Sequence, residues 1–250
     1  MSAILEVSDI SKSYGGIQAV DGASFTLDKT GIYGLIGPNG AGKTTMFDII
    51  CGRQVPDAGK VLFHSSRVDG VEPYKLARQG LARTFQECRV LPEETCLDNV
   101  LFAAQSKRMT SEMLQVFTRN TKHRRDAEVE ARRLLRLINL EQYADQPASD
   151  LSYGQRRLLE IVSCFMSKPR ILLLDEPASG INPTLLNTLR DFLVELYEET
   201  KIVFLIVEHN MEFIMSLAST IIVMHQGRVL MQGAPEQVQA DESVIDAYLG

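Results

Sequence analysis

The sequence has little of what marks a membrane-spanning, secreted or nucleic-acid-binding protein. Its longest purely apolar run, Ile202 to Val207, is bounded by charged residues and is far shorter than the roughly 20 residues that cross a bilayer. The 250 residues include 26 lysines and arginines against 32 acidic residues, a net charge of −6, so no overall positive field attracts nucleic acid. The first residues include Glu6 and Asp9 but no basic leader. We therefore expect a cytoplasmic protein.

Patterns for disulfides and metal sites are also missing. The four cysteines have no C-x-x-C spacing, and the four histidines are too dispersed to supply paired ligands. Zinc sites are usually built from such closely spaced pairs. We expect the cysteines to be buried, reduced thiols. They are Cys51, Cys88, Cys96 and Cys164.

Apolar strands and helical patterns alternate in much of the chain. Ile32 to Ile36 leads into a glycine-rich stretch and then a helix, and similar apolar strands occur at Ile171 to Leu174 and Ile202 to Val207. Such strands are typical of a parallel sheet that is covered on both faces. Gln226-Gly227 predicts the turn of a late hairpin. The alternation predicts an α/β fold. The length permits one large domain or two small ones, and 45% hydrophobic residues are ample for a buried core.

The middle of the chain follows a different pattern. Between about Asp98 and Gln146 the strand signal disappears, and we predict a helical subdomain at about residues 98–166. Seven basic residues against three acidic ones within 119–136 reverse the overall charge there. A solvated helix face explains them, and a docking surface for a partner or for lipid headgroups is the alternative. Five apolar residues share one helical stripe, namely Ala127, Ala131, Leu134, Leu135 and Ile138.

One glycine-rich segment points to phosphate binding. Gly37-Pro38-Asn39-Gly40-Ala41-Gly42-Lys43-Thr44 matches G-x-x-x-x-G-K-[ST] in full, directly after an apolar strand and before a helix. Its glycines let backbone N–H groups converge on phosphate oxygens at the positive end of a helix. We predict that Lys43 reaches the β- and γ-phosphates and that Thr44 offers its hydroxyl to Mg²⁺. Thr45 is expected to bind the nucleotide beside them.

Two carboxylates follow the second apolar strand. Asp175 and Glu176 come directly after Leu174, at the edge of the sheet where α/β proteins bind ligands. We predict that Asp175 holds Mg²⁺, directly or through water, and that Glu176 orients and deprotonates an attacking water. Such a pair can instead cap the next helix. The phosphate-binding segment upstream favours the catalytic interpretation.

A third segment links these motifs to a known family. Leu151-Ser152-Tyr153-Gly154-Gln155 lies between the helical region and the carboxylates, and it resembles the signature of the nucleotide-binding subunits of ATP-binding cassette (ABC) transporters, usually Leu-Ser-Gly-Gly-Gln. The resemblance covers nearly the whole chain and implies a single ATP-binding domain over residues 1–250. It implies a P-loop NTPase cassette with a RecA-like core, an antiparallel β subdomain and a helical subdomain. It also implies that Ser152, Gly154 and Gln155 bind ATP, although Tyr153 replaces the usual glycine.

The resemblance implies three more site residues. Tyr14 would stack on adenine, Gln86 in Thr84-Phe85-Gln86 would sense the metal and the attacking water, and His209 would contact the γ-phosphate. Asn182 stands where the family usually has aspartate. Asparagine keeps the hydrogen-bonding capacity of aspartate but removes its charge.

The resemblance extends to one branch of the family. Arg83 to Gln86, Leu151 to Gln155, Glu208 to Met211 and Val244 to Gly250 look like the ATPases of branched-chain amino-acid importers, and relatives that serve urea or short amides share much of this pattern. It implies an ATP-hydrolysing subunit of a bacterial importer, peripheral on the inner face of the membrane. Its partners would be a second identical or similar ATPase, transmembrane permease subunits and, indirectly, a solute-binding protein.

Two other functions remain as alternatives. A soluble phosphate-loop kinase would not need the signature at Leu151 to Gln155. A cassette protein acting on ribosomes or DNA usually carries two cassettes or a long coiled-coil insertion, and neither is visible in this sequence.

Overall fold

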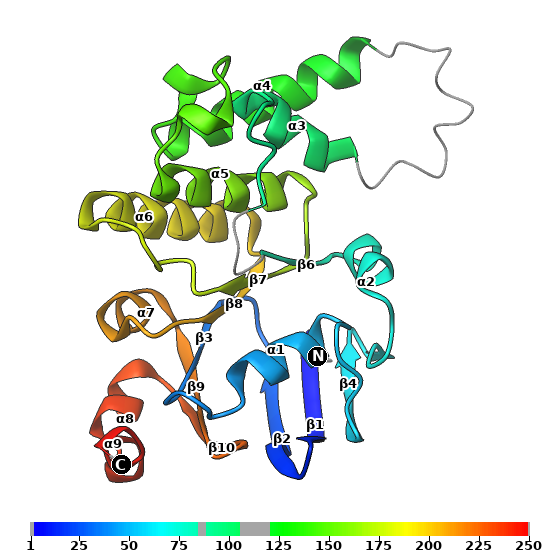
Figure 1. The fold of residues 1–250 in the computed structure, drawn as a ribbon, viewed down its shortest axis with the longest axis vertical. Coiled ribbons are helices and arrows are strands. Elements are labelled where there is room, and N and C mark those ends of the chain that lie inside the picture. Colours follow the sequence, from blue (N-terminus) through cyan, green and yellow to red (C-terminus); the bar gives the residue numbers. More distant parts are fainter. Residues whose placement is uncertain (1–2, 85–88, 106–120, 250) are drawn as a thin grey trace.

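A central six-stranded sheet organises the computed structural model, which describes residues 3–84, 89–105 and 121–249 (Figure 1). The strand order is β10-β9-β3-β8-β7-β6, with β10 antiparallel to its neighbour and the other strands parallel. The inner strands are continuously apolar, as expected for strands buried on both faces. The strands are β3 (Ile32–Ile36), β6 (Leu81–Arg83), β7 (Ile171–Asp175), β8 (Val203–Val207), β9 (Thr220–His225) and β10 (Arg228–Gly233).

A second, antiparallel sheet packs with the helix α1 (Lys43–Ile50) against one face of the central sheet. Its strand order is β2-β1-β4-β5. Leu5, Val7 and Phe25 point into a core that also contains Phe47 of α1. The strands are β1 (Leu5–Tyr14), β2 (Ile17–Leu27), β4 (Ala58–Phe63) and β5 (Ser66–Arg67), and the short helix α2 (Pro73–Gln79) follows them.

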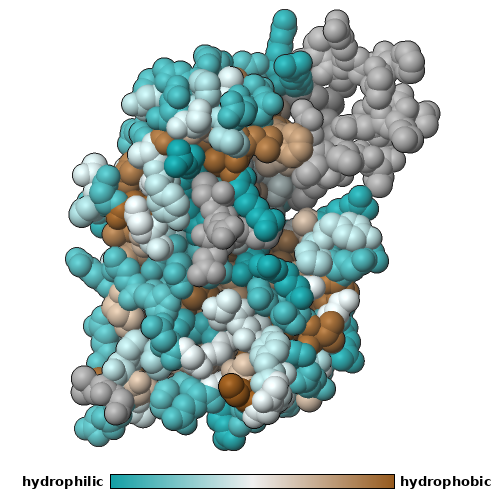
Figure 2. All heavy atoms as spheres, in the orientation of Figure 1, coloured by the Kyte–Doolittle hydropathy of each residue, from teal (hydrophilic) through white to brown (hydrophobic). Residues whose placement is uncertain are grey.

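Helices cover the opposite face of the central sheet, and most of them lie in the upper half of Figure 1. The surface on the side shown in Figure 2 is largely hydrophilic, and hydrophobic residues are most visible among these upper helices. The helices are α3 (Cys96–Gln105), α4 (Thr121–Leu137), α5 (Tyr153–Met166), α6 (Pro183–Thr200) and α7 (Met211–Leu217), with the 3₁₀ turns η1 (Glu141–Tyr143) and η2 (Ala148–Asp150). The chain ends with α8 (Pro235–Ala240) and α9 (Glu242–Leu249).

Alternate residues of the central strands serve the two cores. Leu172 and Leu174 of β7 pack with the upper helices, whereas Ile171 and Leu173 pack with α1 and the antiparallel sheet. Side chains alternate between the faces of a strand, so α5 and α1 lie on opposite faces of the same sheet.

The predicted α/β cassette architecture is confirmed. β3 has the expected bounds, and the expected hairpin turns at Gln226 and Gly227, with φ of 48° and 79°. The helical subdomain at residues 98–166 stays a prediction, although α3, α4 and α5 occupy most of that range. No helix in the described ranges has the length and apolarity to span a bilayer.

The apolar stripe and the basic residues of α4 have separate surroundings. Ala131, Leu134, Leu135 and Ile138 are fully buried, and Ala127 packs against them. Three arginines of α4 bond to acidic partners: Arg132 to Asp145, Arg133 to Glu199 and Arg136 to Glu141. These exposed ion pairs fit the solvated helix face.

No disulfide joins the cysteines that the structure describes. Cys51 and Cys96 are buried and Cys164 is half-buried. This agrees with reduced thiols at those positions, while Cys88 lies outside the described residues.

Candidate functional site

Three neighbouring parallel strands bring the predicted motifs to one edge of the central sheet. Leu35 of β3 is in register with Val207 of β8, and Val207 is in register with Asp175 of β7. The loops that follow these strands therefore lie side by side at the carboxyl edge of the sheet, where α/β folds bind ligands. We call this the nucleotide edge. It contains the phosphate loop (residues 37–45), the pair Asp175 and Glu176, and His209.

The phosphate loop needs glycine for both conformation and space. Gly42 precedes α1 with φ of 96°, and a Cβ there would lie 2.4 Å from the carbonyl oxygen of Ala19. Gly40 also has positive φ, at 80°, but a Cβ there would meet no atom within 4 Å. Asn39, Gly40 and Thr44 are exposed, whereas Gly37 and Ala41 are buried and Thr45 is half-buried. The loop thus has an open side at the start of a helix, where N–H groups lack intrahelical partners.

Lys43 is a buried cation within this loop, 5% exposed. Its ammonium donates hydrogen bonds to the carbonyl oxygens of Gly37 at 2.6 Å and Pro38 at 2.9 Å. Burial lowers the pKa of Lys43, and the negative charge of Glu176 opposes that shift. Two neutral carbonyls compensate a buried charge only partly, so an anion such as a phosphate would bind here favourably.

Asp175 is held in place by a buried arginine that the sequence analysis did not assign a role. The carboxylate is 2% exposed, and its Oδ2 lies 2.7 Å from Nη2 of Arg83. Arg83 also pairs with Asp48 of α1, and its guanidinium lies 5.2 Å from the centre of the Phe47 ring. Arg83 thereby joins β6, β7 and the helix that follows the phosphate loop.

The residues at this edge suit Mg²⁺ that arrives with a nucleotide. The described residues contain no cluster of three or more His, Cys, Asp or Glu side chains that could hold a metal alone. Mg²⁺ is usually bound through one or two carboxylates, water and substrate phosphates. The hydroxyl of Thr44 and the carboxylate of Asp175 are oxygen donors of this kind.

Glu176 and His209 form a polar pair at the same edge. His209 Nε2 lies 2.9 Å from Glu176 Oε1, and both side chains are partly exposed. Glu176 has φ of 46°, and its N–H donates to the carbonyl oxygen of Val207 at 2.9 Å. The unusual backbone conformation and this hydrogen bond direct the two predicted catalytic side chains toward each other.

The signature segment (residues 151–155) begins the helix α5 on the other face of the sheet. Ser152 caps the helix in a capping box with Gln155. Gly154 is tightly packed, because a Cβ there would lie 2.9 Å from Leu185 Cδ1. The ring of Tyr153 lies against Gly180, which explains how tyrosine fits in place of the usual glycine. Within one chain, the signature helix and α1 therefore stay on opposite faces of the sheet.

Two further predicted residues have definite places. Tyr14 ends β1 and is 43% exposed, and the adjoining strand β2 touches the phosphate loop through Ala19. Asn182 caps α6 by accepting a hydrogen bond from the N–H of Leu185 at 3.0 Å, a role that asparagine and aspartate fill equally well. Gln86 lies outside the described residues.

Sequence reasoning also missed other buried charged residues beside the nucleotide edge. Arg157 of α5 donates to the carbonyl oxygen of Asp175 at 2.5 Å and pairs with Glu160. Glu208, 3% exposed, accepts three backbone hydrogen bonds from neighbouring loops. The sequence did contain a signal for them. Arg157 lies on an apolar helix stripe and Glu208 directly follows an apolar strand, and a buried charge at such a position would be costly without a partner.

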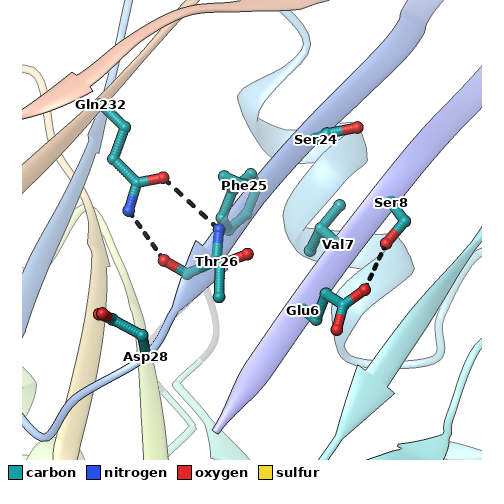
Figure 3. Close-up of a pocket in the computed structure, with 8 residues that line it drawn as sticks. All are labelled: Glu6, Val7, Ser8, Ser24, Phe25, Thr26, Asp28 and Gln232. Carbon is teal, nitrogen blue, oxygen red and sulfur yellow. Dashed lines mark hydrogen bonds between the residues drawn. The ribbon is translucent and has the colours of Figure 1, made fainter. Parts of the chain in front are cut away.

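A separate shallow pocket of about 460 Å³ lies between β1, β2 and β10 (Figure 3). Gln232 crosses it to donate a hydrogen bond to the carbonyl oxygen of Thr26 at 2.8 Å. The acidic Glu6 and Asp28 line it. It shares no lining residue with the phosphate loop.

Two family models match parts of the chain. A family model described as ABC transporter matches residues 20–179, which include the phosphate loop, the signature segment and both carboxylates. The chain belongs to the ABC transporter family. It is an ATP-binding cassette that hydrolyses ATP, as its motifs predict. A second family model, described as branched-chain amino acid ATP-binding cassette transporter, matches residues 228–250 of the cassette.

Relatives of the cassette are similar over nearly their full length. The high-affinity branched-chain amino acid transport ATP-binding protein BraF of Pseudomonas aeruginosa is 39% identical, over 99% of this chain and 98% of the relative. The protein of the same description from Escherichia coli K12, LivG, is 36% identical with the same coverage. The crystal structure of a nucleotide-free ATP-binding cassette from an ABC transporter covers all of both chains, with a TM-score of 0.84 and 29% identity.

Proposed function

We propose that this cassette is the ATP-hydrolysing subunit of an importer for branched-chain amino acids. The nucleotide edge carries the ATPase part of the proposal, because Lys43, Asp175 and the Glu176–His209 pair meet there. The solute is inferred from the family model that matches residues 228–250 and from the described roles of the relatives. Nothing at the nucleotide edge would contact an amino acid.

Each side chain at the edge has a part in the proposed reaction. The phosphate loop and Lys43 hold the β- and γ-phosphates, and Tyr14 stacks on the adenine. Thr44 and Asp175 would hold Mg²⁺, which neutralises phosphate charge when bound.

Glu176 accepts a proton from water as the water oxygen attacks the γ-phosphorus and the bond to the bridging oxygen of ADP breaks. His209 keeps Glu176 aligned and contacts the γ-phosphate, and Gln86 is proposed to sense the metal and the water.

A second cassette would complete the site. Ser152 and Tyr153 are exposed at the start of α5, on the face of the sheet opposite to α1. In our proposal Ser152, Gly154 and Gln155 approach the γ-phosphate bound by another identical or similar cassette. The sandwiched ATP then holds two chains together, and hydrolysis releases them.

The proposed setting is the inner face of the membrane. The cassette would bind transmembrane permease subunits there and act indirectly on a solute-binding protein. Its relatives are described as ATP-binding proteins of amino acid transport, and no nucleic-acid partner is proposed for a chain of net charge −6.

Uptake by a reconstituted complex tests this function. The cassette and the membrane proteins that co-purify with it would be placed in lipid vesicles, and uptake of leucine, valine and urea would be followed with and without ATP. We expect ATP-driven uptake of leucine and valine, and its loss in a matched complex that carries Lys43→Ala. ATP-driven uptake of urea alone, or of none of the three, would contradict the proposed solute.

A further inference from the structure

Glu208 is a buried carboxylate directly after the central strand β8. Its Oε1 accepts a hydrogen bond from the N–H of Ala178 at 2.7 Å. Its Oε2 accepts from the N–H groups of His209 at 3.0 Å and Asn210 at 3.1 Å. With only 3% of its surface exposed, this side chain has exchanged water for three backbone donors, an exchange that is unfavourable unless the donors are well placed.

The three donors belong to two different loops of the nucleotide edge. Ala178 lies in the loop after β7, two residues beyond Glu176, whereas His209 and Asn210 lie in the loop after β8. One carboxylate therefore ties both loops together, with one oxygen toward each. Burial raises the pKa of Glu208, and the three N–H donors oppose that shift.

The same two loops carry the Glu176–His209 pair. Glu176 is connected to Ala178 through Pro177, and the N–H of Ser179 donates to the carbonyl oxygen of Glu176 at 3.1 Å. His209 follows Glu208 directly. The 2.9 Å separation between Glu176 Oε1 and His209 Nε2 thus depends on how far apart the two loops are held.

We propose that Glu208 is a positioning residue for ATP hydrolysis, because it sets the spacing of the two loops and so keeps Glu176 and His209 aligned. The inference rests on the proposed catalytic roles of that pair. Glu208 itself touches neither nucleotide nor water in this account. A carboxylate is required because both oxygens must accept, whereas an amide accepts on one side and presents N–H donors on the other.

Glu208→Gln is the primary test. In either orientation of the amide, one loop loses its acceptor and faces an N–H group instead. We expect kcat for ATP hydrolysis to fall by about 10- to 100-fold, since a misplacement of about 1 Å can cost on the order of 10² in rate. The affinity for ATP, measured by titration with a fluorescent analogue, should stay within about twofold, because Glu208 does not contact the phosphate loop.

A matched control separates positioning from general stability. Asp69 is another carboxylate with little exposed surface that accepts a backbone hydrogen bond, from Val61 at 2.9 Å, but it lies in the turn after β5, in the antiparallel subdomain. Asp69→Asn should keep the wild-type kcat even if its melting temperature falls. A loss of kcat in Asp69→Asn equal to that in Glu208→Gln would mean that stability alone explains both.

A double-mutant cycle with His209→Ala supplies the readout that a purely structural role would not affect. If Glu208 acts through the pair, the double variant should have nearly the kcat of His209→Ala alone. Losses that multiply would overturn the proposal, as would a wild-type kcat in folded Glu208→Gln. If Glu208→Gln fails to fold, Glu208→Asp, which keeps both acceptor oxygens on a shorter stem, takes its place in the same cycle.

The outcome also distinguishes this inference from the proposed function. If wild-type ATPase activity does not depend on Glu176, the catalytic assignment fails. If it does depend on Glu176 while Glu208 variants remain fully active, only the positioning role of Glu208 fails.

Discussion

Hydrogen bonds within the protein orient the charged side chains of single residues at the nucleotide edge. Lys43 is buried, yet its ammonium bonds to carbonyl oxygens of its own loop. Asp175 is buried beside Arg83, which occupies Oδ2. Both groups are therefore oriented before any ligand arrives, which reduces the entropic cost of binding.

Lys43→Ala should weaken ATP binding about 10- to 100-fold. The substitution removes charge-assisted hydrogen bonds, each of which contributes about 1.5–3 kcal/mol, while the glycine backbone of the loop remains. Titration with a fluorescent ATP analogue measures the change, and Lys60→Ala, at an exposed position of β4, serves as the control. An unchanged affinity for ATP would show that Lys43 does not bind the phosphates.

Cys96 should resist alkylation in the folded protein. Burial raises the pKa of its thiol from 9.0 to about 11, so at pH 8 the reactive thiolate is about 100-fold scarcer than in the unfolded chain. Iodoacetamide labelling, quantified at each cysteine by mass spectrometry, should modify Cys96 rapidly only after addition of denaturant. Equal rates in the folded and unfolded protein would contradict its burial.

The same shift predicts how Cys96 contributes to stability. Between pH 9 and about 11 the unfolded chain releases the thiol proton and the folded chain keeps it. Its contribution to folding is thus fully present below pH 9 and is lost as the pH rises toward 11.

At the scale of elements, strand ends determine where the loops of the site lie. The phosphate loop is supported from the outside by the β1–β2 hairpin, since the carbonyl oxygen of Ala19 leaves no room for a side chain on Gly42. The loop after β8 is joined to the loop after β7 through Glu208. Two sheets thus contribute to one site.

Gly42→Ala and Gly40→Ala test this support as a matched pair. Both positions have positive φ, so each alanine should cost about 1–2 kcal/mol. Only Gly42 faces a carbonyl oxygen at 2.4 Å from the added Cβ, so its substitution should cost roughly 3 kcal/mol or more. Urea unfolding without nucleotide measures both. Equal losses of stability would show that the hairpin does not press on the loop.

The predictable elements are those with a strong local pattern. The strand Ile32–Ile36 is apolar throughout, and the helix Tyr153–Met166 begins at a capping box. In contrast, β5 and β6 have only two and three residues, too few for a periodic signal. β4 mixes exposed and buried residues and contains Gly59, and it is a strand because β1 pairs with it.

The candidate site also has a part that the sequence predicts and a part that it does not. Phosphate-loop and carboxylate residues are adjacent in the sequence to the strands that position them, so their meeting at one edge follows from parallel pairing. The contact between Arg83 and Asp175 spans 92 residues, and the contact between Ala178 and Glu208 spans 30. No local pattern encodes such pairs, because they depend on which strands become neighbours in the sheet.

At the scale of the whole molecule, the central sheet separates two cores and two halves of a reaction site. The phosphate loop leads into α1 on one face, and the signature segment leads into α5 on the other. In our proposal, a single chain offers a nucleotide edge and, elsewhere, a segment that completes the edge of another chain. Hydrolysis of each bound ATP in the proposed mechanism therefore requires two cassettes.

The mass of Glu176→Gln in the presence of ATP tests this requirement most directly. The substitution removes the proposed base, which contributes on the order of 10² to 10⁴ in rate, so ATP should remain bound and unhydrolysed. Light scattering coupled to size exclusion should show 27.9 kDa without nucleotide and about twice that mass with Mg-ATP, while the same variant with Ser152→Ala forms less dimer. A Glu176→Gln chain that binds Mg-ATP yet keeps the monomer mass, or that hydrolyses ATP at the wild-type rate, would contradict the account.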